Sequence, residues 1–170
     1  PLTKKASLAP LLETIIFEDN CISFPTAAPN SYIASIASSL IRDQLIASQI
    51  SFTFETVMSS EDKIQVLQAA RDAGFKNYLY YIATDDPDIN VQRVLNRVSI
   101  GGHPVPEEKI RQRYYRSLNL LLSAIQLTDR AFIFDNSGNE AIWLAEINPA
   151  GEIEVQAEEL PDWFYSRVIQ

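Results

Sequence analysis

The chain has 170 residues, 46% of them hydrophobic, which is enough for one domain with a substantial core. Its net charge of −8 argues against general nucleic-acid binding, and its single cysteine and single histidine argue against an internal disulfide and a zinc site. The sequence contains no run of eighteen or more apolar residues, so no membrane span is predicted. The lone Cys21 favours a reducing compartment, and we therefore expect a cytoplasmic protein that binds neither nucleic acid nor membranes and holds no structural metal.

The sequence pattern divides the chain into three parts. Residues 1–29 contain several prolines and little periodicity, so we expect an irregular N-terminal segment. Residues 30–147 alternate helix-like and strand-like patterns and form the predicted core. Residues 148–170 are expected to add the last strand of a hairpin and a short helix around Trp163.

Four segments repeat apolar residues with the period of an amphipathic helix, and they lie at 32–48, 59–73, 85–98 and 106–127. The second is expected to begin with a cap at Ser59 or Ser60 and to end at Gly74. The third has Pro87 in its first turn, a position that favours proline. These signals predict a protein in which helices connect the strands.

Short segments rich in β-branched and aromatic residues alternate with these helices and predict strands at 51–56, 78–83 and 131–135. The segment 78–83 is almost continuously apolar, which is typical of a strand buried on both faces of a parallel sheet. Residues 142–147 and 153–155 are expected to pair as a C-terminal β-hairpin. The order of elements predicts an α/β fold with a parallel sheet and helical crossovers.

Polar residues lie at the carboxyl ends of three of the predicted strands. They are the pairs Glu55–Thr56, Thr84–Asp85 and Asp135–Asn136. Ligands of open α/β sheets bind beyond the carboxyl ends of the strands, so these pairs are placed like site residues. From the residues alone, Glu55 fits a base, a hydroxyl ligand or a capping carboxylate, and Asp135 fits either a nucleotide contact or a simple turn.

Cationic residues concentrate between residues 91 and 116. This stretch has six of them against two acidic residues, a local excess of four positive charges in an acidic chain: Arg93, Arg97, Lys109, Arg111, Arg113 and Arg116. Arginine suits phosphate because its planar fork donates two parallel hydrogen bonds. The alternative is a solvated helix face that makes surface ion pairs. His103 lies in a hinge at Gly101–Gly102, where it can contact phosphate, transfer a proton or serve as a turn residue.

Six short motifs occur in a specific order along the core. They are FETVMS at 54–59, AGF at 73–75, RVLNRV at 93–98, GGHPVP at 101–106, RYYRS at 113–117 and FDNS at 134–137. Together they resemble the zeta-toxin-like P-loop kinase family, in the branch often labelled predicted ABC-type ATPase. The resemblance covers residues 30–147, and the ordered set is more specific than any one motif.

The resemblance implies a kinase fold that binds ATP with Mg²⁺ and phosphorylates a small molecule. Toxin members of the family phosphorylate a UDP-linked amino sugar and are held off by a small antitoxin, so an antitoxin is an implied partner. The implied site residues are, for catalysis, Arg113, Arg116 and Glu55; for the nucleotide, Arg93, Arg97, Asp135 and Asn136; and for the substrate, Glu55, Thr56 and His103.

Two departures from the family pattern limit this expectation. The sequence contains no G-x-x-x-x-G-K-[ST] motif, which the family carries upstream of the helix at 32–48, and Val57 replaces a second threonine after Glu55. A fragment without its P-loop part is the preferred explanation; a second chain that supplies this part and an inactive remnant are the others. We expect the intact protein to be a small-molecule kinase and this chain alone to be inactive. The alternatives are a non-catalytic binding module and a toxin.

Overall fold

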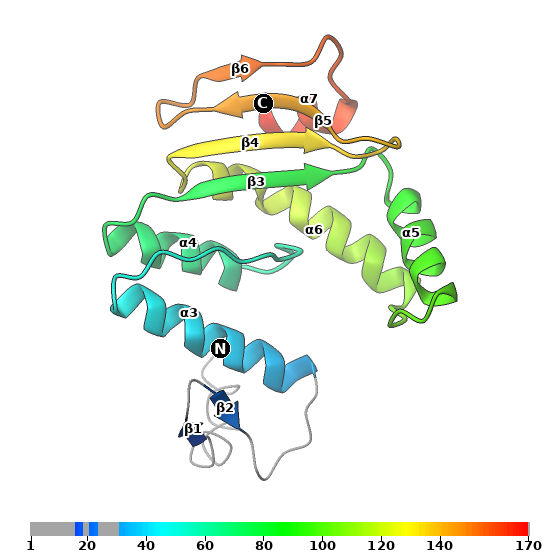
Figure 1. Cartoon of the computed structure of the whole chain (residues 1–170). Coiled ribbons are helices and arrows are strands. Elements are labelled where there is room, and N and C mark those ends of the chain that lie inside the picture. The colour runs from blue at the N-terminus through cyan, green and yellow to red at the C-terminus, as the bar shows by residue number, and fades with distance from the viewer. Residues whose placement is uncertain (1–15, 19–20, 24–30, 170) are drawn as a thin grey trace. The chain divides into compact units, whose positions relative to one another are not determined.

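The computed structural model describes residues 16–18, 21–23 and 31–169, and the chain forms two compact units, Pro1–Ile50 and Ser51–Gln170 (Figure 1). In the first unit, β1 (Ile16–Glu18) pairs with β2 (Cys21–Ser23) in antiparallel fashion, and α3 spans Ser31–Ala47. Helix α3 confirms the helix predicted at 32–48. The rest of the predicted irregular segment lies outside the described residues.

The second unit contains a four-stranded mixed sheet in the order β3-β4-β5-β6. These strands are β3 (Tyr78–Ala83), β4 (Arg130–Asp135), β5 (Ile142–Ile147) and β6 (Ile153–Val155). Strands β3 and β4 are parallel, from Tyr78 opposite Arg130 to Ala83 opposite Asp135. Strands β5 and β6 form the predicted hairpin, and β4 pairs with β5 in antiparallel fashion. The α/β fold is therefore confirmed, with one parallel pair in an otherwise antiparallel sheet.

Four helices precede, connect or follow these strands: α4 (Asp62–Asp72), α5 (Pro87–Ser99), α6 (Glu107–Ile125) and α7 (Asp162–Val168). Helix α5 begins as predicted, because Pro87 occupies its first turn and the Asp86 carboxylate accepts a hydrogen bond from the amide of Asp88 at 2.7 Å. Gly74 follows α4 with a φ of +84°, which only glycine adopts without strain.

The predicted serine cap of α4 is wrong. The residue at the cap position is Glu61, whose side chain makes no capping bond. The hydroxyl of Ser60 instead donates to the carboxylate of Asp62, the first residue of the helix. An acidic residue in the first turn stabilises the positive end of the helix dipole, so the charge of Asp62 stabilises this helix end in place of the capping hydrogen bond that was expected from a serine.

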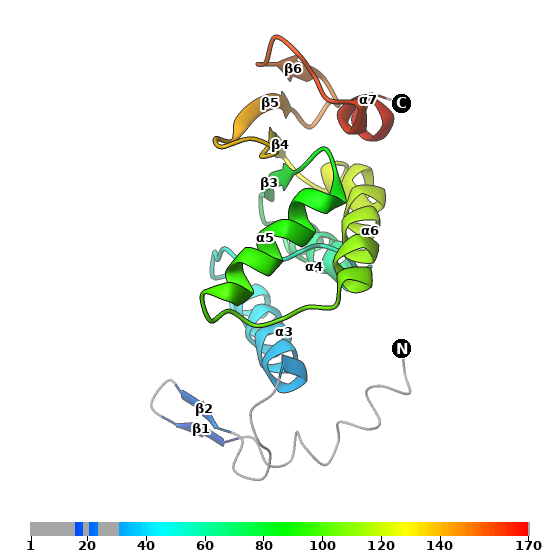
Figure 2. The same ribbon diagram turned by 90° about the vertical axis from the view of Figure 1, so that its right-hand side faces the viewer.

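Helices α6 and α7 cover one face of the sheet and enclose the core (Figure 2). The largest fully buried side chains are Leu121 on α6, Ile133 on β4, Leu144 on β5 and Phe164 on α7. Helix α4 adds Ile64 and Leu67 at the border of this cluster. The core therefore fixes β4 and α6 relative to each other, and these two elements carry three of the nine predicted site residues: Arg113, Arg116 and Asp135.

Strand β3 is buried on one face only, contrary to the sequence prediction. Tyr81 and Ala83 are buried, but Tyr78, Tyr80 and Ile82 are 54%, 66% and 60% exposed. Alternate side chains of a strand point to opposite faces, and the helices of residues 51–169 pack against one of them. An apolar run alone cannot distinguish a strand covered on both faces from one covered on a single face.

The strand predicted at 51–56 is also wrong, because residues 51–59 follow an irregular path. Phe54 and Val57 are exposed, and Met58 is the residue of this segment that enters the core, at 5% exposure and with a φ of +52°. Aromatic and β-branched residues favour a strand when they have a surface to pack against. Here the core contact is made at a single point, through Met58, and not along one face.

Candidate functional site

The carboxyl ends of β3 and β4 are joined through the two loops that follow them. The amide of Asn136 donates to the carbonyl of Ala83 at 2.8 Å, and the amide of Asp85 donates to the Ser137 hydroxyl at 2.7 Å. Helix α5 starts from this edge and lies beyond the arrowheads of β3 and β4 (Figure 1). The polar residues that follow the two strands therefore lie side by side, as expected from the topology of an α/β sheet.

Asp135 is the central residue of the loop after β4. It is 8% exposed, and its carboxylate accepts hydrogen bonds from the Ser137 amide at 2.9 Å, the Ser137 hydroxyl at 3.0 Å and the Trp163 indole at 3.0 Å. These three hydrogen bonds hold the carboxylate in place within the protein. The side-chain amide of Asn136 makes no hydrogen bond to the described part of the chain, whereas the carbonyl of this residue accepts from Arg93.

Two of the predicted nucleotide-binding arginines are anchored to backbone carbonyls. Nη2 of Arg93 donates to the carbonyl of Asn136 at 2.6 Å and to that of Gly138 at 3.3 Å, which ties α5 to the turn after β4. Nη2 of Arg97 lies 3.4 Å from the carbonyl of His103 in the hinge. Both side chains are otherwise exposed, so each guanidinium keeps N–H groups for an anion.

Arg111 fits the alternative of surface ion pairs. Its guanidinium pairs with Glu107 at 2.8 Å and with Asp88 on the first turn of α5. Hydrogen bonds to Glu107 and Asp88 raise the pKa of this guanidinium further above its ordinary value. Arg111 therefore braces α5 against α6 and is not available as a phosphate ligand in this arrangement.

Arg113 and Arg116 differ from the other arginines of the stretch. Both are exposed, and neither makes a hydrogen bond or ion pair with any residue in the described ranges 16–18, 21–23 and 31–169. Arg113 lies one helical turn before Ser117, whose hydroxyl is 3.1 Å from that of Tyr81 on the core face of β3. The two uncompensated charges are therefore carried by a helix whose position is fixed by the core.

The glycine hinge separates α5 from α6 as predicted. Gly101 has a φ of +93°, and the amide of Gly102 donates to the carbonyl of Arg97 at 2.9 Å, closing the end of α5. His103 is exposed and contributes its carbonyl, rather than its imidazole, to the contact with Arg97.

Replacing Gly102 by alanine is expected to lower the free energy of unfolding by about 1–3 kcal/mol. A Cβ at this position would meet Cγ of Arg97 at 2.6 Å and the carbonyl oxygen of Arg97 at 2.7 Å, and the carbonyl cannot move without distorting the helix end. Urea denaturation provides the measurement. Gly138→Ala is the matched control, because a Cβ there has no heavy atom within 4 Å, and equal effects of the two substitutions would contradict the expectation.

Glu55 and Thr56 lie in the irregular segment before Met58, and both are exposed. The hydroxyl of Thr56 accepts a hydrogen bond from the amide of Met58 at 3.2 Å. Met58 combines burial with a left-handed backbone, a conformation that costs about 1 kcal/mol or more in a non-glycine residue. The pair is therefore anchored to the core on one side, but no described hydrogen bond joins it to the arginines or to the Asp135 turn.

Two residues of the site were not anticipated from the sequence. The Tyr114 hydroxyl donates to the carbonyls of Thr84 at 2.8 Å and Asp85 at 3.0 Å, and burial together with the charge of Asp85 raises the pKa of Tyr114 to about 12. At neutral pH this phenol is therefore protonated and braces the end of β3. Trp163 donates to Asp135 from a position 28 residues later in the chain, and no local motif signals that contact.

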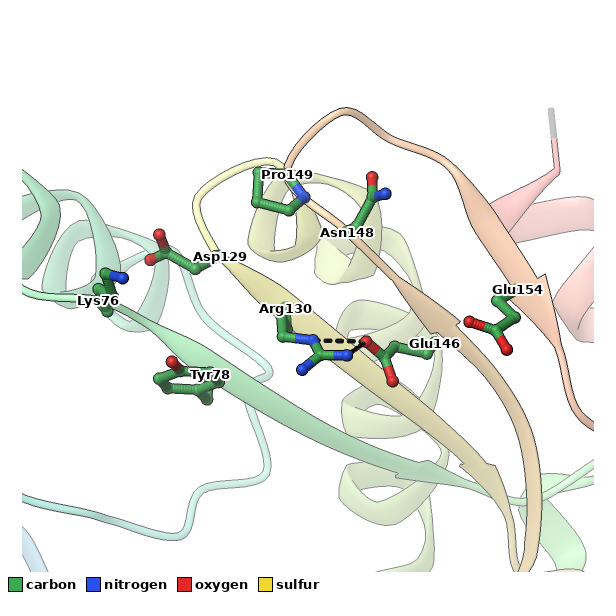
Figure 3. Close-up of a pocket in the computed structure, with 8 residues that line it drawn as sticks. All are labelled: Lys76, Tyr78, Asp129, Arg130, Glu146, Asn148, Pro149 and Glu154. Atoms are coloured by element: carbon green, nitrogen blue, oxygen red, sulfur yellow. Dashed lines mark hydrogen bonds and ion pairs between the residues drawn. The ribbon is translucent and has the colours of Figure 1, made fainter.

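A polar pocket of about 390 Å³ lies at the opposite end of the sheet, where β3 and β4 begin (Figure 3). It is lined by Lys76, Tyr78, Asp129, Arg130, Glu146, Asn148, Pro149 and Glu154. The guanidinium of Arg130 is already paired there with the Glu146 carboxylate, with Nε 2.5 Å from Oε1. None of the predicted site residues lines this pocket, so it is separate from the candidate site.

Among the described residues, no group of three or more His, Cys, Asp or Glu side chains is arranged to hold a metal ion. None of the described helices has the length and apolar character needed to cross a membrane. The described carboxylates therefore do not form a ready-made Mg²⁺ site.

The ordered motifs, the sheet edge and the exposed arginines lie within a part of the chain that a family model matches. The model described as Zeta toxin matches residues 30–148. The chain belongs to the zeta toxin family. This membership confirms the resemblance carried by the sequence motifs, and the α/β architecture is consistent with a P-loop kinase-like fold. The family points to a kinase or toxin type of protein that binds nucleotides.

An uncharacterized protein of Haemophilus influenzae is 35% identical over 69 residues, which are 41% of this chain and 49% of that protein. The chain thus spans about half the length of the curated relative it matches. No solved structure matches the chain. The family assignment therefore rests on the domain match and not on a structural neighbour.

Proposed function

We propose that the intact zeta toxin family protein transfers a phosphoryl group from ATP to a small molecule, and that these 170 residues supply its arginine and substrate side. The observation that carries the proposal is the pair Arg113 and Arg116, two exposed guanidinium groups without ion-pair partners in the described ranges of a chain with a net charge of −8. Exposed arginines without acidic partners are free to bind phosphate oxygens. The family match supports nucleotide binding.

Each predicted residue has a role that follows from its chemistry. Arg113 and Arg116 donate hydrogen bonds to phosphate oxygens and offset the charge that develops on them during transfer. Arg93 holds the turn after β4 and directs its remaining N–H groups to the same anion. The Asn136 amide binds the nucleotide, next to the Asp135 carboxylate that shapes the turn.

The acceptor side of the proposal rests on three exposed residues. Glu55 accepts the hydrogen bond of a substrate hydroxyl and serves as its base, and Thr56 and His103 bind the remainder of the substrate. When bound, ATP supplies the transferable phosphoryl group and Mg²⁺ neutralises part of its charge. The described residues fit the anion but not the metal, because they contain no cluster of three or more carboxylate, imidazole or thiol side chains that could hold it.

A non-catalytic binding module is the second candidate, and one sequence observation favours it. The 170 residues contain no Walker A motif, so they cannot form a P-loop from their own sequence. In this case the arginines hold a nucleotide, or an acidic partner such as an antitoxin, and the protein has a regulatory role without catalysing a reaction.

A growth assay with the intact gene distinguishes a toxin from a metabolic kinase.

Calorimetry with ATP tests the proposed function on the intact protein. We expect the double substitution of Arg113 and Arg116 by alanine to weaken binding by about tenfold or more, because a hydrogen bond to a charged group contributes about 1.5–3 kcal/mol. The matched control removes two cations that lie outside the predicted site, Arg71 and Lys76. Equal affinities of the two double variants would contradict the proposal. Tight, Mg²⁺-independent binding without phosphoryl transfer would favour the binding module.

A further inference from the structure

We infer that Trp163 is a positioning residue for the candidate site, which it controls through the turn at residues 135–137. The inference rests on the proposed function for its consequence, but the contact itself is independent of it. Trp163 lies on α7, beyond the residues 30–148 that match the family. The C-terminal helix is thus an element of this protein that the family match does not cover.

Trp163 is 5% exposed, and its indole donates to Oδ2 of Asp135 at 3.0 Å. The same carboxylate accepts from the amide and the hydroxyl of Ser137. One of the three donors to this buried charge therefore comes from α7. A buried carboxylate that loses a donor must recruit water or rotate toward another partner, because an unsatisfied buried charge is unstable.

The turn transmits this constraint to two other segments. The Ser137 hydroxyl, which donates to Asp135, also accepts the amide of Asp85 at 2.7 Å in the loop before α5. The carbonyl of Asn136 accepts Nη2 of Arg93 at 2.6 Å. Rotation of the Asp135 carboxylate therefore changes the Asp85 loop and the anchor of Arg93 together.

Helix α7 packs against the core, and this packing fixes the position of the Trp163 indole. Phe164 is fully buried and Val168 is buried on the same helix. Nη1 of Arg167 donates to Oδ1 of Asn119 on α6 at 2.7 Å. The indole also packs at 6.4 Å from the ring of Tyr81, on the core face of β3. The contact thus links the core to the carboxyl edge of the sheet.

Amide hydrogen exchange of the intact protein tests the inference without any nucleotide. We expect Trp163→Phe, which keeps an aromatic ring and removes the N–H group, to speed exchange of the Asp85 and Ser137 amides by about tenfold or more. Trp143→Phe is the matched control, because that indole donates to the carbonyl of Ala145 at 3.1 Å and does not contact the turn. Phe164→Leu controls for a general loosening of α7. Such loosening would speed the exchange of many amides and not selectively that of Asp85 and Ser137.

If Trp163→Phe does not fold, Arg93→Ala tests the same hydrogen-bond network by removing the donor to the Asn136 carbonyl. The change is on an exposed side chain and is expected to shift the indole proton resonance of Trp163 and not that of Trp143. Unchanged exchange in Trp163→Phe, or an unmoved Trp163 resonance in Arg93→Ala, would overturn the inference. Selective changes in a protein that binds no ATP would support the positioning contact and refute the proposed function.

Discussion

Replacing Arg113 by alanine in the intact protein is expected to lower kcat by about 100-fold or more, with a smaller change in KM for ATP. Donors aimed at charge that develops in a phosphoryl-transfer transition state contribute effects of this size. Arg113 is suited to this role because it is exposed, has no described ion-pair partner and stands on a helix fixed by Tyr114 and Leu118. Steady-state measurement of ADP formation with the natural acceptor provides the test.

Two further variants, Arg71→Ala and Arg113→Lys, serve as the control and as the conservative substitution for this measurement. Arg71→Ala removes an exposed arginine of α4 that bonds to the carbonyl of Gln126, so its kcat should match that of the wild type. Arg113→Lys should recover only part of the lost rate, because an ammonium group lacks the planar fork of a guanidinium. A rate in Arg113→Ala equal to that of the Arg71→Ala control would remove Arg113 from the catalytic site.

Replacing Phe164 by alanine is expected to lower the free energy of unfolding by about 3–5 kcal/mol, the usual cost of a large cavity left by a buried aromatic ring. Phe164 is fully buried and packs with its ring centroid 6.0 Å from that of Trp163. Urea denaturation of the intact protein measures the loss. Since small domains are stable by only about 5–15 kcal/mol, the substitution removes a large part of the stability.

The neighbouring residue Tyr165 provides the control for this substitution. It lies on the same helix and is 52% exposed, so Tyr165→Ala should change the free energy of unfolding by about 0.5 kcal/mol or less. A loss below about 1 kcal/mol in Phe164→Ala would mean that α7 does not contribute to the core as the structure has it.

The helices and the C-terminal hairpin could be predicted from the sequence because their signals are local. The apolar period of α5 and α6, the proline at the start of α5 and the turn around Asn148 each act within a few residues. The carboxyl edge of β3 and β4 could also be predicted, since the topology of a parallel pair places both loops together. The family motifs then indicated which side chains at that edge to consider.

Three features that were not predicted, at β3, Asp135 and Arg111, depend instead on distant parts of the chain. Burial of β3 on one face depends on which helices cover the sheet, and the pattern of Tyr78–Ala83 carries no information about that. Asp135 is held by Trp163, 28 residues later, and Arg111 is neutralised by Asp88, 23 residues earlier. The sequence therefore identified a group of cations, and the structure distinguished the paired Arg111 from Arg113 and Arg116.

The brace formed by Arg111 and Asp88 closes a ring that runs through α5, the hinge and the first turns of α6. The link that closes this ring is an exposed ion pair, which contributes little to stability and is screened by salt. Ionic strength therefore acts on Arg93 and Arg97 in two ways: it weakens their attraction for phosphate, and it weakens the ion pair that holds α5, the helix that carries them, against α6. Binding constants measured at low salt will combine a stronger charge interaction with a more rigidly held α5.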